Sequence, residues 1–353
     1  MNRVVALKYL SVFTLPVLVY ISFHSKGWLT FLPMIEAFVI IPLLELLFKP
    51  DPGNISKEQE EIRKKDRLYD FLLYLVVPVQ FYFLYLFLNV MQQPGLTIIE
   101  IAGRISAMGL MCGVIGINVA HELGHRNTWY EQLMAKGLLL TSLYMHFFIE
   151  HNRGHHKNVS TPEDPSSARY GESLYAFWFR SVWYSYASAW KIERQRLKKK
   201  KAAFLSWNNE MLIFQIIQFA LVISILNFFG LQVMLYFLIA ATIGFLLLET
   251  VNYIEHYGLE RQKKDSGYYE RVMPHHSWNS DHIVGRLILF ELSRHSDHHF
   301  IASRKYQLLR HIDQSPQMPT GYPGMMLMAT VPPLWFAIMN KRVKEFSRSL
   351  SPV

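Results

Sequence analysis

Residues 98–125 read IIEIAGRISAMGLMCGVIGINVAHELGH, an apolar stretch followed at once by two histidines that flank a glutamate. A helix needs about 20 mostly apolar residues to cross the hydrocarbon of a bilayer, and residues 98–120 meet that need. If the helix continues, His121 and His125 lie four residues apart on one face, where two imidazoles can bind one metal ion. This stretch therefore predicts a membrane helix with metal ligands at its end.

The composition of the whole chain agrees with a membrane protein. Of 353 residues, 51% are hydrophobic and 18% are charged, whereas an ordinary soluble domain has about 25% charged residues. The mean hydropathy of +0.12 is too low for a chain embedded in lipid throughout, so polar segments must separate the spans. We expect an all-α integral membrane protein, one domain over residues 1–353, with six transmembrane helices at residues 4–23, 28–48, 69–90, 98–120, 212–229 and 233–251. The first span lacks a small-residue cleavage site and is expected to be retained.

Basic loops predict the orientation. Residues 49–67 carry six lysines and arginines, and residues 191–201 carry seven against one acid, Glu193. Both segments should therefore lie on the cytoplasmic side of the inner membrane. Residues 121–211 and 252–353 then form the cytoplasmic catalytic segments. The net charge of +9 indicates basic loops rather than nucleic-acid binding. The run Lys198–Lys201 is first a topology determinant, and alternatively a docking patch for an acidic soluble partner.

Histidines are the other unusual feature, because the chain has fifteen of them and only one cysteine, Cys112. The single cysteine excludes a disulfide framework and all-cysteine metal sites. Histidines recur in HNRGHH at residues 151–156, singly at His256, and in HSDHH at residues 295–299. Together with the first pair they make nine candidate ligands, too many for one zinc ion: His121, His125, His151, His155, His156, His256, His295, His298 and His299. Imidazole suits iron, zinc, copper and nickel, and a redox-active pair of irons fits the count best.

Several interpretations compete with a di-iron site. Read alone, HELGH is typical of a zinc metalloprotease with Glu122 as base. A non-catalytic metal transporter would instead place polar residues along the spans as a pathway, whereas the candidate ligands here gather at one end of the spans. Isolated histidines such as His24 and His311 are best explained as structural. Four further histidines could orient the metal ligands, but plain structural hydrogen bonding explains them at least as well: His146, His275, His276 and His282.

Five stretches resemble those of the bacterial integral-membrane alkane monooxygenases, in the wider membrane fatty-acid desaturase and hydroxylase superfamily. The most specific is NYIEHYG at residues 252–258, an N-Y-x-E-H-Y-G element. The others are IEHNRGHHKNVSTPEDP at 149–165, HHSWNSDHI at 275–283, RHSDHH at 294–299 and PTGYPG at 319–324.

The resemblance implies that the nine histidines bind two non-haem iron ions. It also implies that medium- to long-chain n-alkanes are hydroxylated at the terminal carbon to 1-alkanols, with O2 and electrons from a rubredoxin that a rubredoxin reductase reduces. Aromatic methyl groups, as in xylene, and fatty acyl chains are the alternative substrates. The similarity includes no fused electron carrier. Four acids inside the motifs are expected to orient imidazoles or carry protons: Glu122, Asp164, Glu255 and Asp297.

A terminal C–H bond offers no polar handle, so the enzyme must select it by shape. A tunnel between apolar spans, open to the bilayer, would deliver the chain to the metals. The span at residues 28–48 is apolar enough to line it, and the small Ala37 would leave room for a longer chain, although ordinary packing explains any one of these residues as well. Four charged residues in the spans have no role that the sequence assigns: Glu36, Glu45, Glu100 and Arg104.

Overall fold

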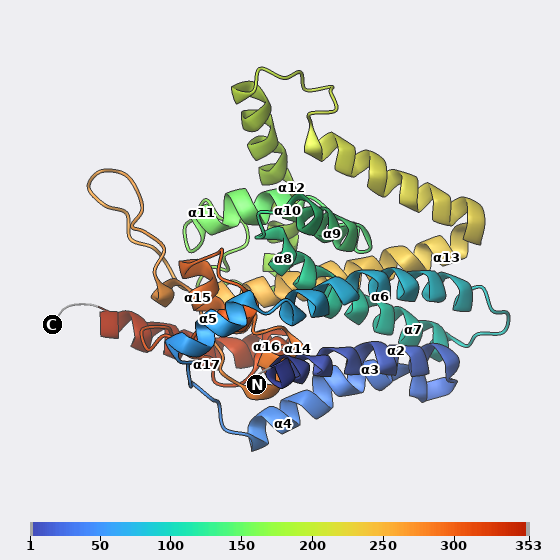
Figure 1. Cartoon of the computed structure of the whole chain (residues 1–353), viewed down its shortest axis with the longest axis horizontal. Coiled ribbons are helices and arrows are strands. Elements are labelled where there is room, and N and C mark those ends of the chain that lie inside the picture. Colours follow the sequence, from blue (N-terminus) through green and yellow to red (C-terminus); the bar gives the residue numbers. More distant parts are fainter. Residues whose placement is uncertain (1–2, 351–353) are drawn as a thin grey trace.

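The structure is a computed structural model that describes residues 3–350, and over these residues it is all-helical. No named β-strand occurs in this part of the chain, which contains only two isolated bridges, Lys263 with Tyr269 and Asn279 with Gln317. Long helices form one side of the molecule, and shorter helices joined by irregular segments cover the end where the chain termini lie (Figure 1).

Five helical stretches are long and apolar enough to cross a membrane: Leu7–His24, Gly27–Leu47, Leu68–Val90, Ile98–Gly124 and Glu210–His256. The first contains η1 (Leu7–Phe13) and α2 (Thr14–His24), preceded by α1 (Arg3–Ala6). The second joins η2 (Gly27–Phe31), α3 (Leu32–Ile35), η3 (Glu36–Ile40) and α4 (Ile41–Leu47). The third is α6 (Leu68–Val90), and the fourth joins α7 (Ile98–Leu110), η4 (Met111–Ile117) and α8 (Asn118–Gly124). The first four predicted spans therefore lie within helices of the structure.

The predicted fifth and sixth spans are the two arms of one broken helix, α13 (Glu210–His256). Its 47 residues would extend roughly 70 Å if straight, far more than one crossing requires. The break is at Gly230, whose φ of +83° is a backbone conformation that glycine adopts without a steric penalty. Figure 1 shows the two arms meeting at a sharp bend at the far end of the bundle.

The end of the bundle with this bend is held together by two of the charged residues in the spans. The Arg104 guanidinium donates to the Val90 carbonyl at 3.0 Å and to Gln93 Oε1 at 3.1 Å. Glu100 completes a capping box with Thr97 at the start of α7 and also accepts from the Gly27 amide at 3.1 Å. Arg104 and Glu100 thus fasten the links between helices at this end, which explains their presence in an apolar segment.

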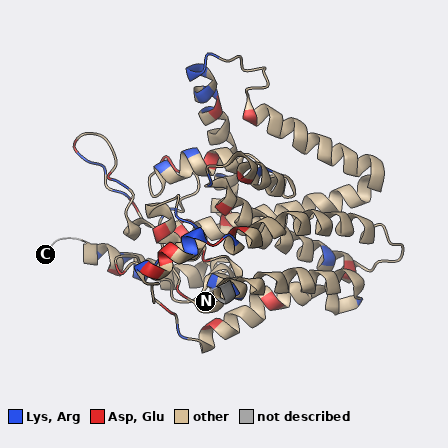
Figure 2. Cartoon of the chain, in the orientation of Figure 1, with Lys and Arg blue, Asp and Glu red and all other residues tan. Residues whose placement is uncertain are grey.

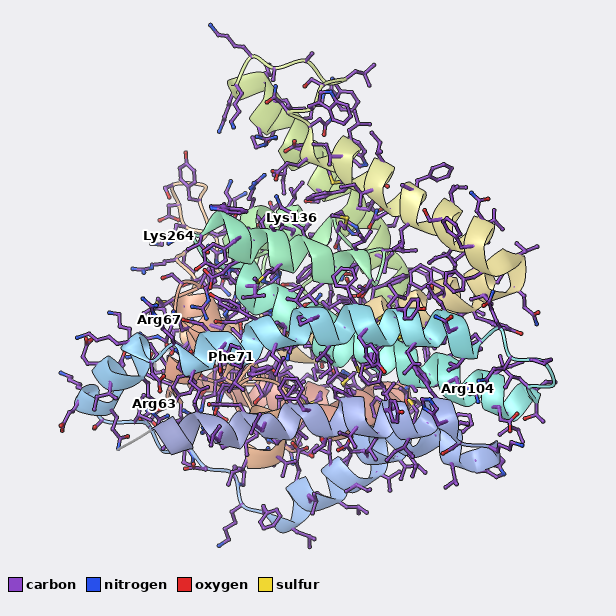
Figure 3. All side chains as sticks on the ribbon, turned by 45° about the vertical axis from the view of Figure 1, so that its right-hand side comes forward. Arg63, Arg67, Phe71, Arg104, Lys136 and Lys264 are labelled. Atoms are coloured by element: carbon purple, nitrogen blue, oxygen red, sulfur yellow. The ribbon has the colours of Figure 1, made fainter. Side chains whose placement is uncertain are left out.

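Charge is distributed unevenly over the molecule. Most lysines, arginines and acids lie on the short helices, in the loops and on the free end of α12 (Leu174–Lys199), whereas the long helices carry few charges (Figure 2). Arg63 and Arg67 lie at one end of the bundle and Arg104 at the other (Figure 3). The remaining short elements are α5 (Lys57–Lys65), α9 (Trp129–Leu140), α10 (Phe147–Glu150), η5 (His151–His155), α11 (His156–Asn158), η6 (Pro274–His276), α14 (Ile283–Ile288), α15 (His295–Phe300), η7 (Tyr306–Leu308), α16 (Tyr322–Ala329) and α17 (Pro332–Leu350).

Two apolar cores hold these layers in place. The larger core lies between α2, α6, the α7–η4–α8 stretch and α13. The smaller core packs the end of α13 against α16 and α17, with Tyr253, Tyr322 and Trp335 completely buried. Because this second core fixes the end of α13 against the C-terminal segment, it also determines where the histidines of both segments meet.

Candidate metal centre

All nine predicted ligands come together at one end of the bundle, although they are as much as 178 residues apart in the sequence. They come from the end of α8, from η5 and α11, from the end of α13 and from α15. They form two groups, and within each the candidate ligand atoms lie within 4.8 Å of one another. Group A is His121, His125, His151, His156 and His298, and group B is His155, His256, His295 and His299.

In group A the imidazole Nε2 atoms converge on one another. The His121 and His298 Nε2 atoms are 2.7 Å apart, and the His151 Nε2 atom is 3.1 Å from that of His125 and 3.0 Å from that of His156. Nitrogen ligands that each lie about 2.0–2.1 Å from one ion, at right angles, are about 3 Å apart. The arrangement of group A therefore fits a metal ion at its centre.

Group B shows the same convergence with fewer ligands. The Nε2 atoms of His155 and His299 are 3.2 Å apart, as are those of His256 and His295. All four side chains are buried, with at most 5% of the residue exposed. Group B therefore also suits metal binding.

A π-helical turn divides the histidines of HNRGHH between the two groups. The spacing of four between His151 and His155 would place them on one face of an α-helix, but η5 is wound as a π-helix. The wider turn places His156, five residues on, beside His151 in group A, and directs His155 to group B. In α15, which is α-helical, His295 joins His299 at a spacing of four, and His298 belongs to the other group.

Two of the four acids contact the histidines, and both contact group B. The His155 Nδ1–H donates to Asp164 at 2.8 Å, and Asp164 also accepts from the Ser167 hydroxyl. Glu255 Oε2 is 3.1 Å from His295 Nε2, and its other oxygen accepts from the Tyr322 hydroxyl at 2.7 Å. Tyr322 comes from the PTGYPG motif and was not singled out as a site residue from the sequence.

The other two acids fasten the chain around the groups instead. Glu122 pairs with Arg126 at 2.6 Å and accepts from the Tyr306 amide at 3.2 Å. Asp297 pairs with Arg304 at 3.1 Å and Arg310 at 3.0 Å. These contacts hold α8 and α15 against the segment that follows α15.

Burial favours the neutral form of the group A imidazoles outside the membrane spans, and the neutral form is the one that binds metal. Burial first, and then the charges of His155 and Arg126, lower the pKa of His125 to about 3. Burial and neighbouring imidazoles likewise lower the pKa of His151, His156 and His298 well below the ordinary value. An isolated surface histidine would titrate near pH 6.5.

The remaining histidines lie outside both groups. His24 contacts the Tyr20 carbonyl, His282 contacts Ser280, and His311 pairs with Asp281. The His146 ring packs against Tyr144 and Tyr186.

His275 and His276 form a third cluster with Glu270. In this cluster, however, His276 Nδ1 accepts from the Met273 amide at 3.0 Å, so that Nε2 carries the proton toward Glu270. Both ring nitrogens of His276 are therefore engaged in hydrogen bonds, and we interpret this cluster as stabilising the loop.

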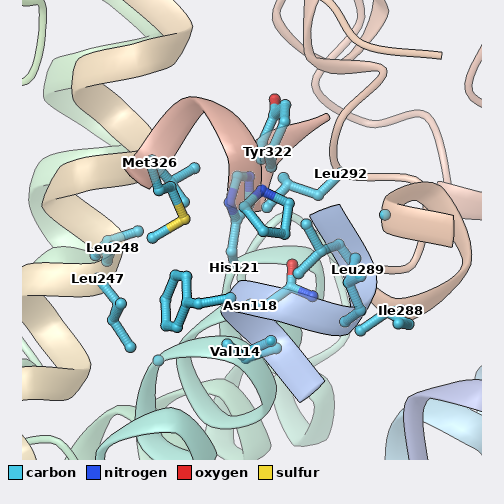
Figure 4. A pocket seen from close by; sticks show the side chains of 17 residues that line it. Val114, Asn118, His121, Leu247, Leu248, Ile288, Leu289, Leu292, Tyr322 and Met326 are labelled. Carbon is cyan, nitrogen blue, oxygen red and sulfur yellow. The ribbon is translucent and has the colours of Figure 1, made fainter. Parts of the chain in front are cut away.

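An apolar cavity of about 70 Å³ ends at His121 (Figure 4). This is about half the volume of an engineered cavity that holds benzene, so it accommodates a chain end. The π-helical turns η3 and η4 both contribute to its wall, with Ala37 and Phe38 from η3 and Val114 from η4. Apart from His121, its polar lining residues are Asn118 and Tyr322; neither was predicted, although Asn118 lies one helical turn before His121.

Comparison with known proteins identifies relatives along most of the chain. A family model described as fatty acid desaturase matches residues 100–327. Alkane 1-monooxygenase 1 of Pseudomonas aeruginosa is 43% identical over 92% of this chain and 85% of its own length. Alkane 1-monooxygenase of Acinetobacter baylyi is 42% identical over 87% of this chain and 75% of its own length. The xylene/toluene monooxygenase hydroxylase component of Pseudomonas putida is 29% identical over 69% of this chain and 64% of its own.

The helical bundle, the two histidine groups and these relatives agree with one another and with the resemblance of the sequence motifs. The chain belongs to the alkane 1-monooxygenase family, within the membrane fatty acid desaturase and hydroxylase superfamily.

Proposed function

We propose that this protein hydroxylates the terminal carbon of medium- to long-chain n-alkanes, giving 1-alkanols. The observation that carries the proposal is the apolar cavity that ends at His121, a member of group A. A substrate without polar groups is held by an apolar wall, and the wall leads it to the histidines.

The cofactor that we propose is a pair of non-haem irons, one in each histidine group. Converging Nε2 atoms and neutral imidazoles fit a divalent first-row metal, and the oxidation of a C–H bond requires one with redox chemistry. When bound, the irons supply the activation of O2 and the oxidising power. The ion, its number and the assignment of all nine histidines as ligands belong to this proposal.

The chain itself contributes orientation and exclusion of water. Leu247, Leu248 and Val251 from α13 face the wall that contains Ala37 and Phe38, so that a chain end reaches His121 without water around it. Asp164 accepts from His155 Nδ1 and so orients this imidazole with Nε2 toward the other ligand atoms. Glu255 contacts His295 at Nε2, on the same side as the other ligand atoms of group B. The Tyr322 hydroxyl fixes Glu255 from the side of the cavity.

Electrons are proposed to come from a rubredoxin that a rubredoxin reductase reduces. His125 and His156 are the only members of the two groups that are half-buried rather than buried, so group A lies nearer to the surface. We place this surface in the cytoplasm and the six apolar stretches across the inner membrane, because the basic segments at residues 49–67 and 191–201 favour that orientation.

A second substrate class is favoured by one observation, the similarity to the xylene/toluene monooxygenase component. The same centre acting on an aromatic methyl group is the alternative, and fatty acyl chains remain a third possibility. A zinc protease is less consistent with the geometry, because Arg126 pairs with Glu122 and His298 lies beside His121.

The test uses the purified protein in lipid nanodiscs with rubredoxin, its reductase and NADH as the source of electrons. We expect about two irons per chain and 1-dodecanol as the product from dodecane. Parallel reactions with p-xylene and with a fatty acyl substrate distinguish the alternatives. Absence of the terminal alcohol from a protein that carries both irons, together with turnover of p-xylene, would contradict the proposed substrate.

A further inference from the structure

Asn118 is an unusual residue in the wall of the cavity. It begins α8 and precedes His121 by three residues, so the two side chains lie on the same helix face. Both line the cavity, and Figure 4 shows them next to each other between Val114 and Tyr322. Asn118 has only 8% of its surface exposed.

The Asn118 amide nitrogen has no hydrogen-bond partner among the described residues. The two other polar groups at the cavity are engaged, because the Tyr322 hydroxyl donates to Glu255 and His121 Nε2 faces His298. Among other amide nitrogens in the bundle, Gln215 Nε2 also lacks a partner, but it does not line the cavity, and two buried ones have partners. Gln80 Nε2 donates to the Thr141 hydroxyl at 3.0 Å, and Asn252 Nδ2 donates to Glu249 at 3.3 Å.

A buried donor without a partner is unfavourable, so the chemistry of the cavity indicates what would satisfy it. An alkane offers no acceptor. A water molecule needs two to four polar partners, whereas the other two polar residues of the wall, His121 and Tyr322, are already engaged. A primary alcohol meets both requirements, because its hydroxyl oxygen accepts one hydrogen bond and its chain fills the apolar space.

We propose that Asn118 forms a hydroxyl subsite, in which its Nδ2–H donates to the hydroxyl oxygen of a 1-alkanol bound in the cavity. The identification of this alcohol as the reaction product rests on the proposed function. The subsite lies one helical turn from His121, next to the position where a terminal carbon would be hydroxylated. The cavity therefore distinguishes product from substrate by one hydrogen bond, and the 1-alkanol competes with the next alkane.

The test measures binding without turnover, in nanodiscs that contain the iron-loaded protein but no electron donor. 1-Dodecanol and dodecane each displace radiolabelled dodecane from the wild type, from Asn118→Leu and from Val114→Ala. Leucine has nearly the shape of asparagine but no donor. We expect Asn118→Leu to weaken the binding of 1-dodecanol about tenfold, the effect of one net hydrogen bond. The affinity for dodecane should stay within about twofold of the wild type. Val114→Ala, the matched control, should weaken the binding of both ligands to the same extent.

An equal effect of Asn118→Leu on both ligands, or no effect on either, would overturn the subsite. If this variant does not fold, the test uses the wild type alone and compares its affinities for 1-dodecanol and 1-chlorododecane. The chloride is close in size to the alcohol but is a much weaker hydrogen-bond acceptor. Its affinity, corrected for partition into the same lipid, should fall well below that of 1-dodecanol; equal affinities would overturn the subsite. Dodecane turnover is measured separately, so loss of turnover with the alcohol preference intact would count only against the proposed function.

Discussion

The two histidine groups are built from the same residue type but differ in their surroundings. Group A has five histidines, two of them half-buried, and one wall of the cavity is formed by its His121. Group B has four, all buried, and is the one that the carboxylates of Asp164 and Glu255 contact. A carboxylate that accepts from the nitrogen opposite the ligand atom, as Asp164 does at His155 Nδ1, fixes the orientation of the imidazole and raises its basicity. We infer from this difference that group A is the more accessible of the two and that the ligands of group B are held more rigidly.

The largest effects are expected from removing one ligand of each group. His156→Ala in group A and His299→Ala in group B should each abolish hydroxylation and reduce the iron content from about two to about one per chain. His24→Ala, a histidine outside both groups, is the control and should keep both irons. Metal analysis of the three purified variants checks this prediction. Full activity of either ligand variant would contradict the proposed two-metal centre.

Removing the carboxylate partner of His155 should have the next largest effect, and this effect should be confined to group B. Asp164→Asn removes the charge that holds His155, so the affinity of group B for iron should fall about 10- to 100-fold. Asp297→Asn is the matched control, since this acid pairs with Arg304 and Arg310 instead. It should lower the melting temperature with little effect on iron affinity. Titration with a chelator, followed by iron analysis, distinguishes the two variants. Equal iron loss in both would contradict a special role of Asp164 in group B.

The cavity next to group A should determine which alkanes react. Ala37→Phe places a ring in the wall of the cavity, so the longest alkane converted should become shorter by several carbons, while iron content stays unchanged. Val39→Phe is the control, because Val39 lies in the same turn and is 48% exposed. Product profiles for alkanes of graded length give the result. A profile unchanged by Ala37→Phe would show that the substrate does not pass this wall.

The smallest expected effect is the pH dependence of the iron-free protein. The pKa of His125 is lowered to about 3 in the folded state, and the pKa values of His156 and His298 are also lowered. The unfolded chain therefore binds more protons below pH 6.5, and folding stability is complete above that value and is lost as the pH falls toward 3. The melting temperature of the iron-free protein should decrease by several degrees between pH 7 and pH 5.

Iron-loaded protein is the comparison in this pH series. Bound metal keeps the imidazoles deprotonated, so its melting temperature should stay constant until acid releases the iron. A flat profile for the iron-free protein would contradict the burial of neutral imidazoles.

Much of the fold can be predicted from the lengths of the apolar stretches and from the residues that interrupt them. The first four spans were placed within a few residues, because uninterrupted apolar stretches of that length have few other stable structures. The break at Gly230 was also anticipated as a short link between two spans, although the structure winds both arms into one helix with a bend. The local winding was not predicted, since nothing in the sequence HNRGHH distinguishes a π-helical turn from an α-helical one.

An apolar helical protein with nine histidines in four motifs can be predicted from the amino-acid sequence, since helix length and ligand type are local properties. The division of the histidines between groups A and B depends on tertiary packing and could not be predicted in this way. His121 meets His298 because the C-terminal segment folds back over the end of the bundle, and His151 separates from His155 because η5 is a π-helix. Tertiary packing also places Asn118 without a partner in an apolar wall. Which groups converge depends on packing between segments far apart in the chain, and local sequence patterns carry no direct information about that packing.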